Sequence, residues 1–156
     1  MFIIVLVHSM LNLRAHHLLC LVIPNEDDFR SMAPEMFRRK GYTEEYISAY
    51  MRAFEAARKN FDEEIRVLDD PREDDTCIYC GNYRGGVCLS PQAEIYAGWD
   101  LEILDLLGLR ASEVLMVKDL RRLVREKISP ANAPGVCRGC LFNLLDKCRE
   151  NLSRLK

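Results

Sequence analysis

The sequence has no large excess of charge of either sign. Its 22 lysine and arginine residues stand against 24 aspartate and glutamate residues, which leaves a formal net charge of -2 at pH 7. A nearly neutral chain has no strong electrostatic attraction to nucleic acid or to an anionic membrane, so neither is expected as the main partner. At 156 residues with 49% hydrophobic content, the chain can bury a core without metal staples.

Long hydrophobic runs are also missing. The apolar run at 2–7 is far shorter than the roughly 20 residues that a membrane-spanning helix needs, and no lysine or arginine precedes it as in a signal peptide. We interpret this run as a buried strand or an appended tail. Because the 7 cysteines are odd in number and no secretory signal is seen, a disulfide framework is disfavoured and a cytoplasmic location is expected.

The chain lacks the motifs of the common enzyme classes. It contains no recognisable Ser-His-Asp set, phosphate-binding loop, dinucleotide fingerprint or paired-carboxylate site. A conventional hydrolase or kinase is therefore not expected. Whether the protein is an enzyme of another kind is left open by the sequence.

What the sequence does contain is one cysteine spacing that occurs twice. Six of the seven cysteines form two copies of the pattern C-x2-C-x7-C, which we call the first triad (Cys77, Cys80 and Cys88) and the second triad (Cys137, Cys140 and Cys148). A Cys-x-x-Cys pair on a tight turn directs two sulfurs at one point, and the third thiol gives three ligands of a tetrahedral or cluster site. The duplication predicts metal or cluster binding, with each triad one ligand short.

The missing ligands are expected from the segment 14–20, which reads Arg-Ala-His-His-Leu-Leu-Cys. It holds Cys20 together with His16 and His17, two of the three histidines. On a helix, a histidine three or four residues before Cys20 lies on the same face as the cysteine. Cys20 can complete only one triad, so the other triad must take His16, His17 or an external ligand. The alternative for each histidine is a buried ring that is hydrogen-bonded within the core.

The surroundings of the two triads differ. Acidic residues at 73–75 precede the first triad, and they are better tolerated beside thiolates when a metal cation is bound. The connector of the first triad is rich in glycine, whereas the connector at 141–147 is apolar and is expected to be helical, with Phe142, Leu144 and Leu145 excluding water. The two sites therefore need not hold the same metal group.

The periodicity of apolar residues predicts an α+β fold, predominantly helical, with one or two short strands. We expect residues 1–12 to form an N-terminal extension or strand and residues 13–156 to form a single metal-binding or cluster-binding domain. The expected elements are a helix in 29–40 that begins near Pro34, helices at 43–61, 90–107 and 112–127, and a strand at 64–68. Phe61 and Ile95 are assigned to the apolar faces of their helices, and Gly98 is taken as a site of close helix packing.

Several sequence motifs of this chain occur together in a known family. They are the segment 14–20, Gly-Tyr-Thr at 41–43, the pair Asp74-Asp75 before the first triad, the Leu-Gly-Leu ending of 100–109, and 125–130 before the second triad. On these motifs the sequence resembles, from Leu13 to Cys148, small bacterial and archaeal proteins of unknown function that are thought to bind iron-sulfur clusters. The resemblance implies an iron-sulfur cluster, with the 4Fe-4S type favoured.

Two classes of function follow. The first is a redox or cluster-carrying protein, in which Cys77, Cys80, Cys88 and Cys20 hold one cluster and the second triad holds another cluster or metal. This class implies a redox partner protein. The second class is a zinc-stapled interaction module without enzymatic activity, in which sites of four cysteines, or of three cysteines and one histidine, tie loops together.

Overall fold

The computed structural model describes residues 10–59, 61–140 and 144–154. The apolar run at 2–7 and Phe142 lie outside these residues. The larger elements are β1 (Leu11–Arg14), α1 (Ala15–Val22), α2 (Glu26–Arg39), α3 (Glu44–Lys59), β2 (Glu64–Leu68), α4 (Ala93–Leu107), β5 (Val114–Met116), α5 (Val117–Lys127) and α7 (Leu145–Leu152). The smaller ones are η1 (Cys77–Tyr79), β3 (Tyr83–Arg84), β4 (Val87–Cys88), η2 (Pro130–Asn132) and α6 (Gly135–Arg138). The predicted α+β, predominantly helical fold is confirmed.

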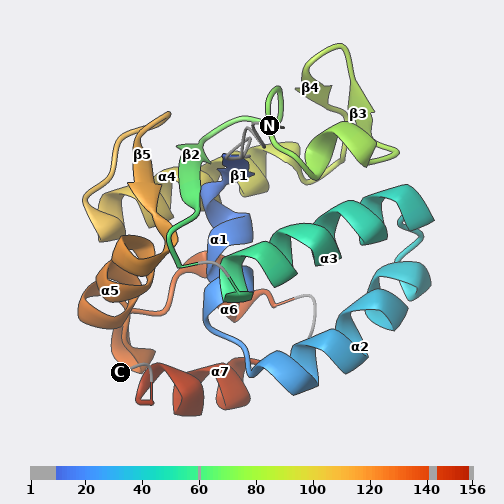
Figure 1. Cartoon of the computed structure of the whole chain (residues 1–156). Helices are drawn as coiled ribbons and strands as arrows, with labels where there is room; N and C mark the ends of the chain where they lie inside the picture. Colours follow the sequence, from blue (N-terminus) through green and yellow to red (C-terminus); the bar gives the residue numbers. More distant parts are fainter. Residues whose placement is uncertain (1–9, 60, 141–143, 155–156) are drawn as a thin grey trace, which may run out of the picture.

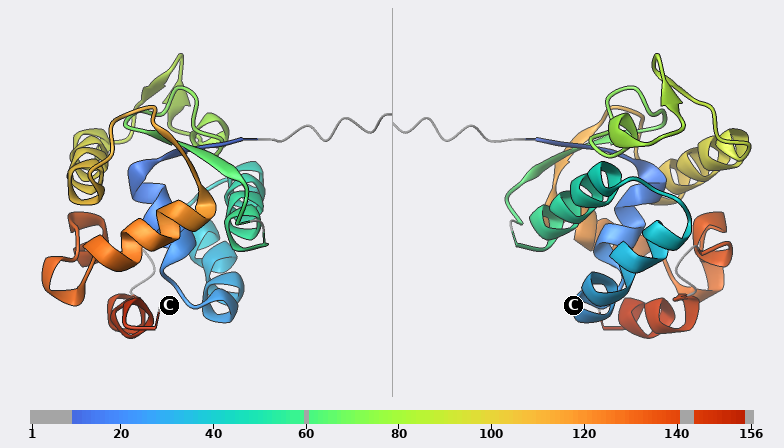
Figure 2. Two further views of the ribbon diagram at one scale, coloured as in Figure 1. Left: turned by 60° about the vertical axis from the view of Figure 1, so that its left-hand side comes forward. Right: turned by 90° about the vertical axis from the view of Figure 1, so that its right-hand side faces the viewer.

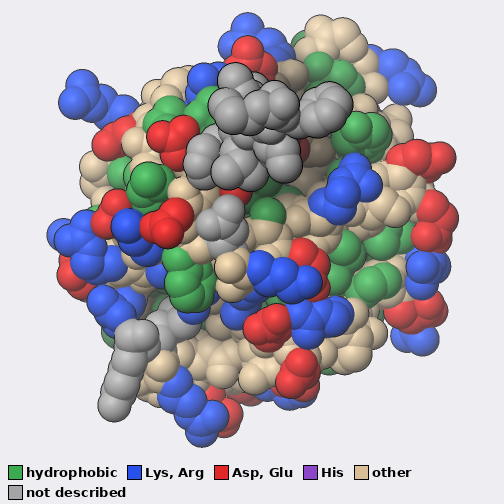
Figure 3. Space-filling model, viewed as in Figure 1, with side chains coloured by type: hydrophobic (Ala, Val, Ile, Leu, Met, Phe, Trp, Pro, Cys, Tyr) green, Lys and Arg blue, Asp and Glu red, His purple; other side chains and the backbone are tan. Residues whose placement is uncertain are grey.

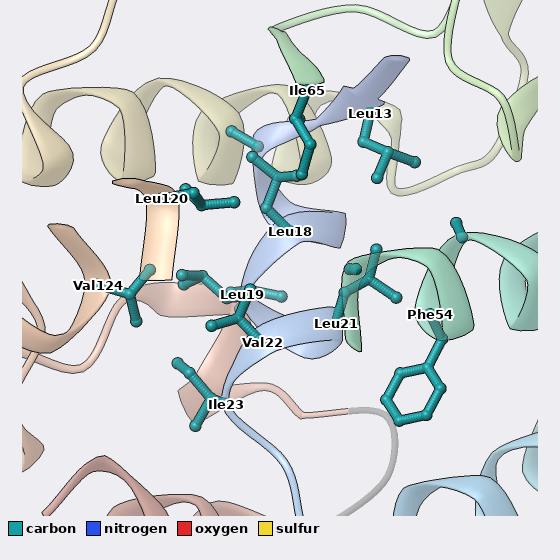
Figure 4. Close-up of a cluster of buried hydrophobic side chains, with 14 of the residues drawn as sticks. Leu13, Leu18, Leu19, Leu21, Val22, Ile23, Phe54, Ile65, Leu120 and Val124 are labelled. Carbon is teal, nitrogen blue, oxygen red and sulfur yellow. The ribbon is translucent and has the colours of Figure 1, made fainter. Parts of the chain in front are cut away.

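Helix α1 lies at the centre of the molecule, with α3 on one side and α5 on the other (Figure 1). All of its residues except Cys20 are buried, as expected for a helix that is apolar nearly all round. Leu21 lies on the side of Phe54 in α3, and Leu19 on the side of Val124 in α5 (Figure 4). The histidines and the cysteine of α1 are therefore held at the middle of the fold rather than on a loop.

A three-stranded sheet covers the beginning of α1. β1 pairs in parallel with β2, and β2 pairs antiparallel with β5, so the strand order is β1-β2-β5. β2 spans the predicted strand. β1 overlaps the segment 1–12, for which a strand was one of two alternatives, only at residues 11 and 12, and β5 was not predicted. Both are short, and β5 occupies part of the segment expected to be helical. The helix α5 begins five residues later than predicted because Val114–Met116 pair with β2. Ser112, just before them, adopts a φ of 67°, which a helix cannot contain.

The β3–β4 hairpin is a separate two-stranded sheet within the first triad's connector. Gly85 and Gly86 form its turn with φ values of 54° and 86°, a combination that favours glycine in tight hairpins. In both views of Figure 2 the hairpin lies at the opposite end of the molecule from α7. The glycine-rich connector thus folds back on itself and returns Cys88 toward Cys80.

Helices α2 and α3 differ from the prediction at their ends. α2 begins at Glu26 because the Asn25 side chain accepts hydrogen bonds from the N–H groups of the first turn, so Pro34 lies inside the helix and the predicted start there is wrong. α3 begins as predicted but ends at Lys59. Phe61 is consequently 49% exposed, and the prediction that it belongs to the core is wrong. Its ring lies 5.0 Å from the guanidinium carbon of Arg121.

Helix α4 ends as predicted at Gly108, whose φ of 68° stops the helix in the left-handed conformation. Two other expectations for this helix are wrong. Ile95 is 52% exposed rather than part of the core, and a Cβ at Gly98 would meet no atom within 4 Å, so no element packs closely there. In α5 the predicted apolar face is buried as expected, with Val117 and Val124 fully buried.

The surface carries charges of both signs, and on the face seen in Figure 3 the acidic and basic side chains are interspersed. None of the helices in the part of the chain that the structure describes combines the length and apolar character needed to cross a lipid bilayer.

Candidate functional site

A cavity of about 160 Å³ lies against α1 and collects most of the predicted ligands. Seven of the nine candidate residues line it: His16, His17, Cys20, Cys77, Cys80, Cys88 and Cys140. The other two, Cys137 and Cys148, line a smaller hollow next to it. Cys20 and Cys140 line both spaces, so the two triads lie on either side of a shared wall.

Cys20 lies with the second triad. The smaller hollow is lined by Cys20, Cys137, Cys140 and Cys148, which we call the four-cysteine set. Cys20 comes from α1, Cys137 from α6 and Cys148 from α7. The other described residues of the lining are apolar: Leu19, Ile23, Pro24, Val136 and Leu144. The arrangement differs from the one in which Cys20 completes the first triad.

The electrostatics of the four-cysteine set disfavour bare thiolates. Burial raises the pKa of Cys20 well above its usual range, and the nearby thiols of the second triad raise it further. The Tyr50 hydroxyl near the Cys20 sulfur acts in the opposite direction and lowers the pKa of Cys20. Burial and Cys140 likewise raise the pKa of Cys137 to about 11 and of Cys148 to about 12. Thiols with raised pKa values lose their protons readily only when a metal cation binds the sulfur. The four-cysteine set is therefore better suited to binding a metal than to acting as a nucleophile.

The first triad is built by a tight turn and the β3–β4 hairpin. The N–H of Cys80 donates to the carbonyl of Cys77 at 2.9 Å, which closes the Cys-x-x-Cys turn over η1. Cys88 pairs with Tyr83 across the hairpin and returns toward Cys80, whose pKa is raised by burial and by Cys88. Burial and Asp74 raise the pKa of Cys77, while the positive charge of Arg14 lowers it.

Asp74 holds the first triad's turn to β1. Its side chain is fully buried. Oδ1 accepts hydrogen bonds from the N–H of Thr76 at 2.8 Å, the hydroxyl of Thr76 at 2.6 Å and the N–H of Cys77 at 2.7 Å. Oδ2 accepts from the N–H of Arg14 at 2.6 Å and lies 3.1 Å from Nδ1 of His17. Burial opposes ionisation, but His17 and the hydrogen bonds outweigh it and hold the pKa of Asp74 below its usual range.

Asp100 on α4 holds the start of α1 in place, as Asp74 holds the turn of the first triad. This fully buried carboxylate accepts from Nε and Nη2 of Arg14, each at 2.7 Å, and from the backbone N–H of His16 at 3.0 Å. Its Oδ1 also lies 2.7 Å from Nδ1 of His16. Burial, with a smaller contribution from His17, lowers the pKa of His16 to about 4, so its imidazole is neutral at pH 7 and donates Nδ1–H to Asp100.

Both histidines therefore have a carboxylate at Nδ1. In the described ranges, no hydrogen bond involves Nε2 of His16 or of His17. A carboxylate on one ring nitrogen is the usual support for a histidine that binds metal through the other. Each ring is thus buried and hydrogen-bonded at Nδ1, as the alternative to a ligand role requires. Its Nε2 is still able to bind a metal.

His17 is the histidine that lies close to a cysteine of the first triad. A ring nitrogen of His17, a carboxylate oxygen of Asp74 and the sulfur of Cys77 all lie within 4.8 Å of one another, the one such group among the described histidine, cysteine and acidic residues. Asp74 already accepts hydrogen bonds at both oxygens, which favours a bracing role for it over a role as ligand. His17 remains the nearest candidate for a fourth ligand there.

Sequence reasoning missed the roles of Arg14, Asp74 and Asp100. All three lay within or beside the quoted motifs, but they were treated as surroundings. One local signal was present, because an aspartate three residues before Cys77 can accept the backbone N–H groups of the following turn. The pairing of Asp100 with α1 had no local signal, since 86 residues separate it from Arg14.

Trp99 lies between the cavity and α6, lining the cavity and approaching Gly135 of α6. Its ring approaches His16 edge-on with the centroids 6.2 Å apart. A Cβ built at Gly135 would lie 2.7 Å from Nε1 of Trp99, so only glycine fits at that position without displacing the indole. The N–H of Gly135 also donates to Oε2 of Glu102 at 2.8 Å.

We expect Gly135→Ala to lower the free energy of unfolding by about 1–3 kcal/mol through overpacking against Trp99. Gly98→Ala is the matched control on α4, where the new methyl group has open space and helix propensity should stabilise by about 0.5–1 kcal/mol. Urea unfolding of the two variants measures both effects. Equal stability of the two variants would contradict the close packing of Trp99 on Gly135.

Comparison with protein families gives one match. Residues 41–146 match the model of a family described as "Protein of unknown function (DUF1284)". The matched range contains the first triad together with Cys137 and Cys140, and it leaves Cys148 and the segment 14–20 outside. No significant match was found among curated proteins or among solved structures.

Proposed function

The chain belongs to the DUF1284 family of proteins of unknown function, and we propose that it is an iron-sulfur protein that carries electrons or clusters. In this proposal the four-cysteine set holds one cluster. The first triad holds a second metal group through three thiolates, with His17 or an external molecule at the remaining position.

The observation that carries the proposal is the gathering of Cys20 with the second triad. Three separate elements, α1, α6 and α7, each direct a cysteine to one hollow with an aliphatic lining. Four thiolates are the usual ligand set of an iron-sulfur cluster, and a dry aliphatic shell with few hydrogen bonds tunes its potential and protects it from solvent.

The spacing of the sulfurs differs from the spacing around a bound zinc ion. A tetrahedral zinc ion with Zn–S bonds near 2.3 Å holds its sulfurs about 3.8 Å apart. No three of the seven cysteine sulfurs, all of which are described, lie within 4.8 Å of one another. A four-iron cluster places iron and sulfide atoms between its thiolates and so keeps them further apart than a single zinc ion does.

The second candidate function is that of a zinc-stapled module, with a zinc ion bound by the four-cysteine set. The small size of the hollow that these cysteines line favours it. The hollow measures about 20 Å³, against about 160 Å³ for the cavity at the first triad. A single ion needs less room than a cluster. In that case the set is a structural staple, and the larger cavity is the better place for a cluster.

Elemental and spectroscopic analysis of anaerobically purified protein decides between these functions. We expect iron and acid-labile sulfide in near-stoichiometric amounts, and a brown protein whose broad visible absorption bleaches on reduction. Colourless, redox-silent protein that holds zinc even when iron is supplied during anaerobic expression would replace the first candidate by the second. Protein with neither metal, whose seven thiols all react freely, would remove both.

A further inference from the structure

The cavity at the first triad opens into a second, polar space, which we call the vestibule. It has a volume of about 480 Å³, and seven of its ten lining residues also line the cavity. Cys80 is among the shared residues, so the vestibule leads to a thiol of the first triad. The four-cysteine set contributes only Cys140 to this space.

Glycines keep the vestibule open. Gly41, Gly81 and Gly139 all line it, and a Cβ placed at Gly41 or Gly81 would meet no atom within 4 Å. Gly81 has no positive φ, whereas Gly41 has a φ of 83°. A side chain at position 81 would therefore fit in the lining of the vestibule without backbone strain, and a large side chain there is our means of closing it.

The charged and polar groups of the vestibule are suited to an anion. Among the described residues of the lining, Lys40 is the only charged side chain and none is acidic. None of the ion pairs in the described part of the chain involves Lys40. Oε1 of Gln92 accepts the Tyr96 hydroxyl at 2.7 Å, which leaves the Gln92 amide N–H groups to donate to a bound molecule.

We propose that the vestibule binds a small molecule with one carboxylate group, placed beside the non-cysteine position of the first triad's metal group. The inference rests on the proposed function, because that position exists only when three thiolates hold a metal. One cation and one amide donor match a single carboxylate, and carboxylate oxygens are suitable ligands for iron. The rings of Tyr42 and Tyr96 in the lining supply the apolar contact for the rest of the molecule.

Lactate is the probe, and lactamide is its neutral control. Saturation-transfer NMR on the metal-loaded protein measures binding, and the EPR spectrum of the reduced protein reports contact with iron. We expect lactate to bind, to shift the EPR spectrum and to be competed poorly by lactamide. Lys40→Gln should weaken binding about tenfold, the effect of losing one charge-assisted hydrogen bond, and Gly81→Leu should abolish it.

Gly98→Leu is the matched control, because it adds the same side chain at an exposed glycine outside both spaces. Binding that survives Gly81→Leu, equal binding of lactamide, or lactate binding to the iron-loaded protein without an EPR change would each overturn the proposal. So would the absence of lactate binding at 50-fold excess over the protein. Iron and sulfide analysis of the same samples tests the proposed function separately, and the NMR measurement reports on the vestibule whichever metal is found.

Discussion

Cys20→Ala is expected to remove the metal of the four-cysteine set and to leave the metal of the first triad in place. A structural thiolate site can contribute on the order of 10 kcal/mol, which is comparable with the whole net stability of about 5–15 kcal/mol of a domain. Cys20 is the only member of the set on the central helix, so its loss also removes the link through the metal from α1 to α6 and α7. We expect the metal content to fall by about half and the melting temperature to drop steeply.

Leu21→Ala is the matched control for this variant. Leu21 lies on the same helix, is buried and lines neither the cavity nor the hollow. Its truncation should cost about 2–5 kcal/mol through lost packing while the metal content stays at the parent value. Metal analysis together with thermal unfolding separates the two effects. Full metal content in the Cys20→Ala protein would show that Cys20 is not a ligand.

The histidines next to Cys20 are predicted to differ from it and from each other. The sequence alone predicts that His16→Ala and His17→Ala have unlike effects, and the structure supplies a reason. His17 lies within 4.8 Å of the Cys77 sulfur, whereas His16 stacks on Tyr96 with centroids 5.5 Å apart. His17 is thus the candidate whose loss alters the first triad's metal group, and His16 acts through the wall of the cavity.

The sequence predicted elements best where a long periodic pattern coincided with end signals. α3 follows Thr43, α4 ends at Gly108, and β2 alternates between faces, so their existence required no tertiary information. β5 was missed, and the bounds of β1 were not predicted, because a strand of three or four residues shows little periodicity and forms only when its partner is present. Phe61 and Ile95 were misplaced because the ends of a helix can leave the core while the pattern continues.

The candidate site was predicted in composition but not in pairing. The repeated spacing identified the six triad cysteines, and the ligand-rich segment identified Cys20 and both histidines. Whether Cys20 lies beside the first or the second triad depends on how α6 and α7 pack on α1. No local sequence pattern predicts this packing. The buried carboxylates were missed for the same reason, since Asp100 meets Arg14 only after α4 packs on the central helix.

Asp74→Asn is expected to disorganise the first triad and to cost about 3–5 kcal/mol, as is typical when one partner of a buried ionic network is removed. Asn has the shape of Asp, but one of its two terminal groups is a donor. At Asp74 both oxygens accept, from N–H groups of Arg14, Thr76 and Cys77. The amide NH2 must therefore face another donor, and the turn that presents Cys77 loses its anchor to β1.

Asp75→Asn provides the comparison on the adjacent residue. Asp75 is only partly buried, and its Oδ2 accepts one backbone hydrogen bond, from Asn12 at 2.8 Å. The loss of that interaction should cost about 1 kcal/mol. Unfolding of the metal-free proteins measures the two costs, and metal analysis should show the first triad's metal reduced in Asp74→Asn alone. If both variants unfold alike and keep their metal, Asp74 does not hold the turn, and Cys77 must be positioned by the hairpin and its metal instead.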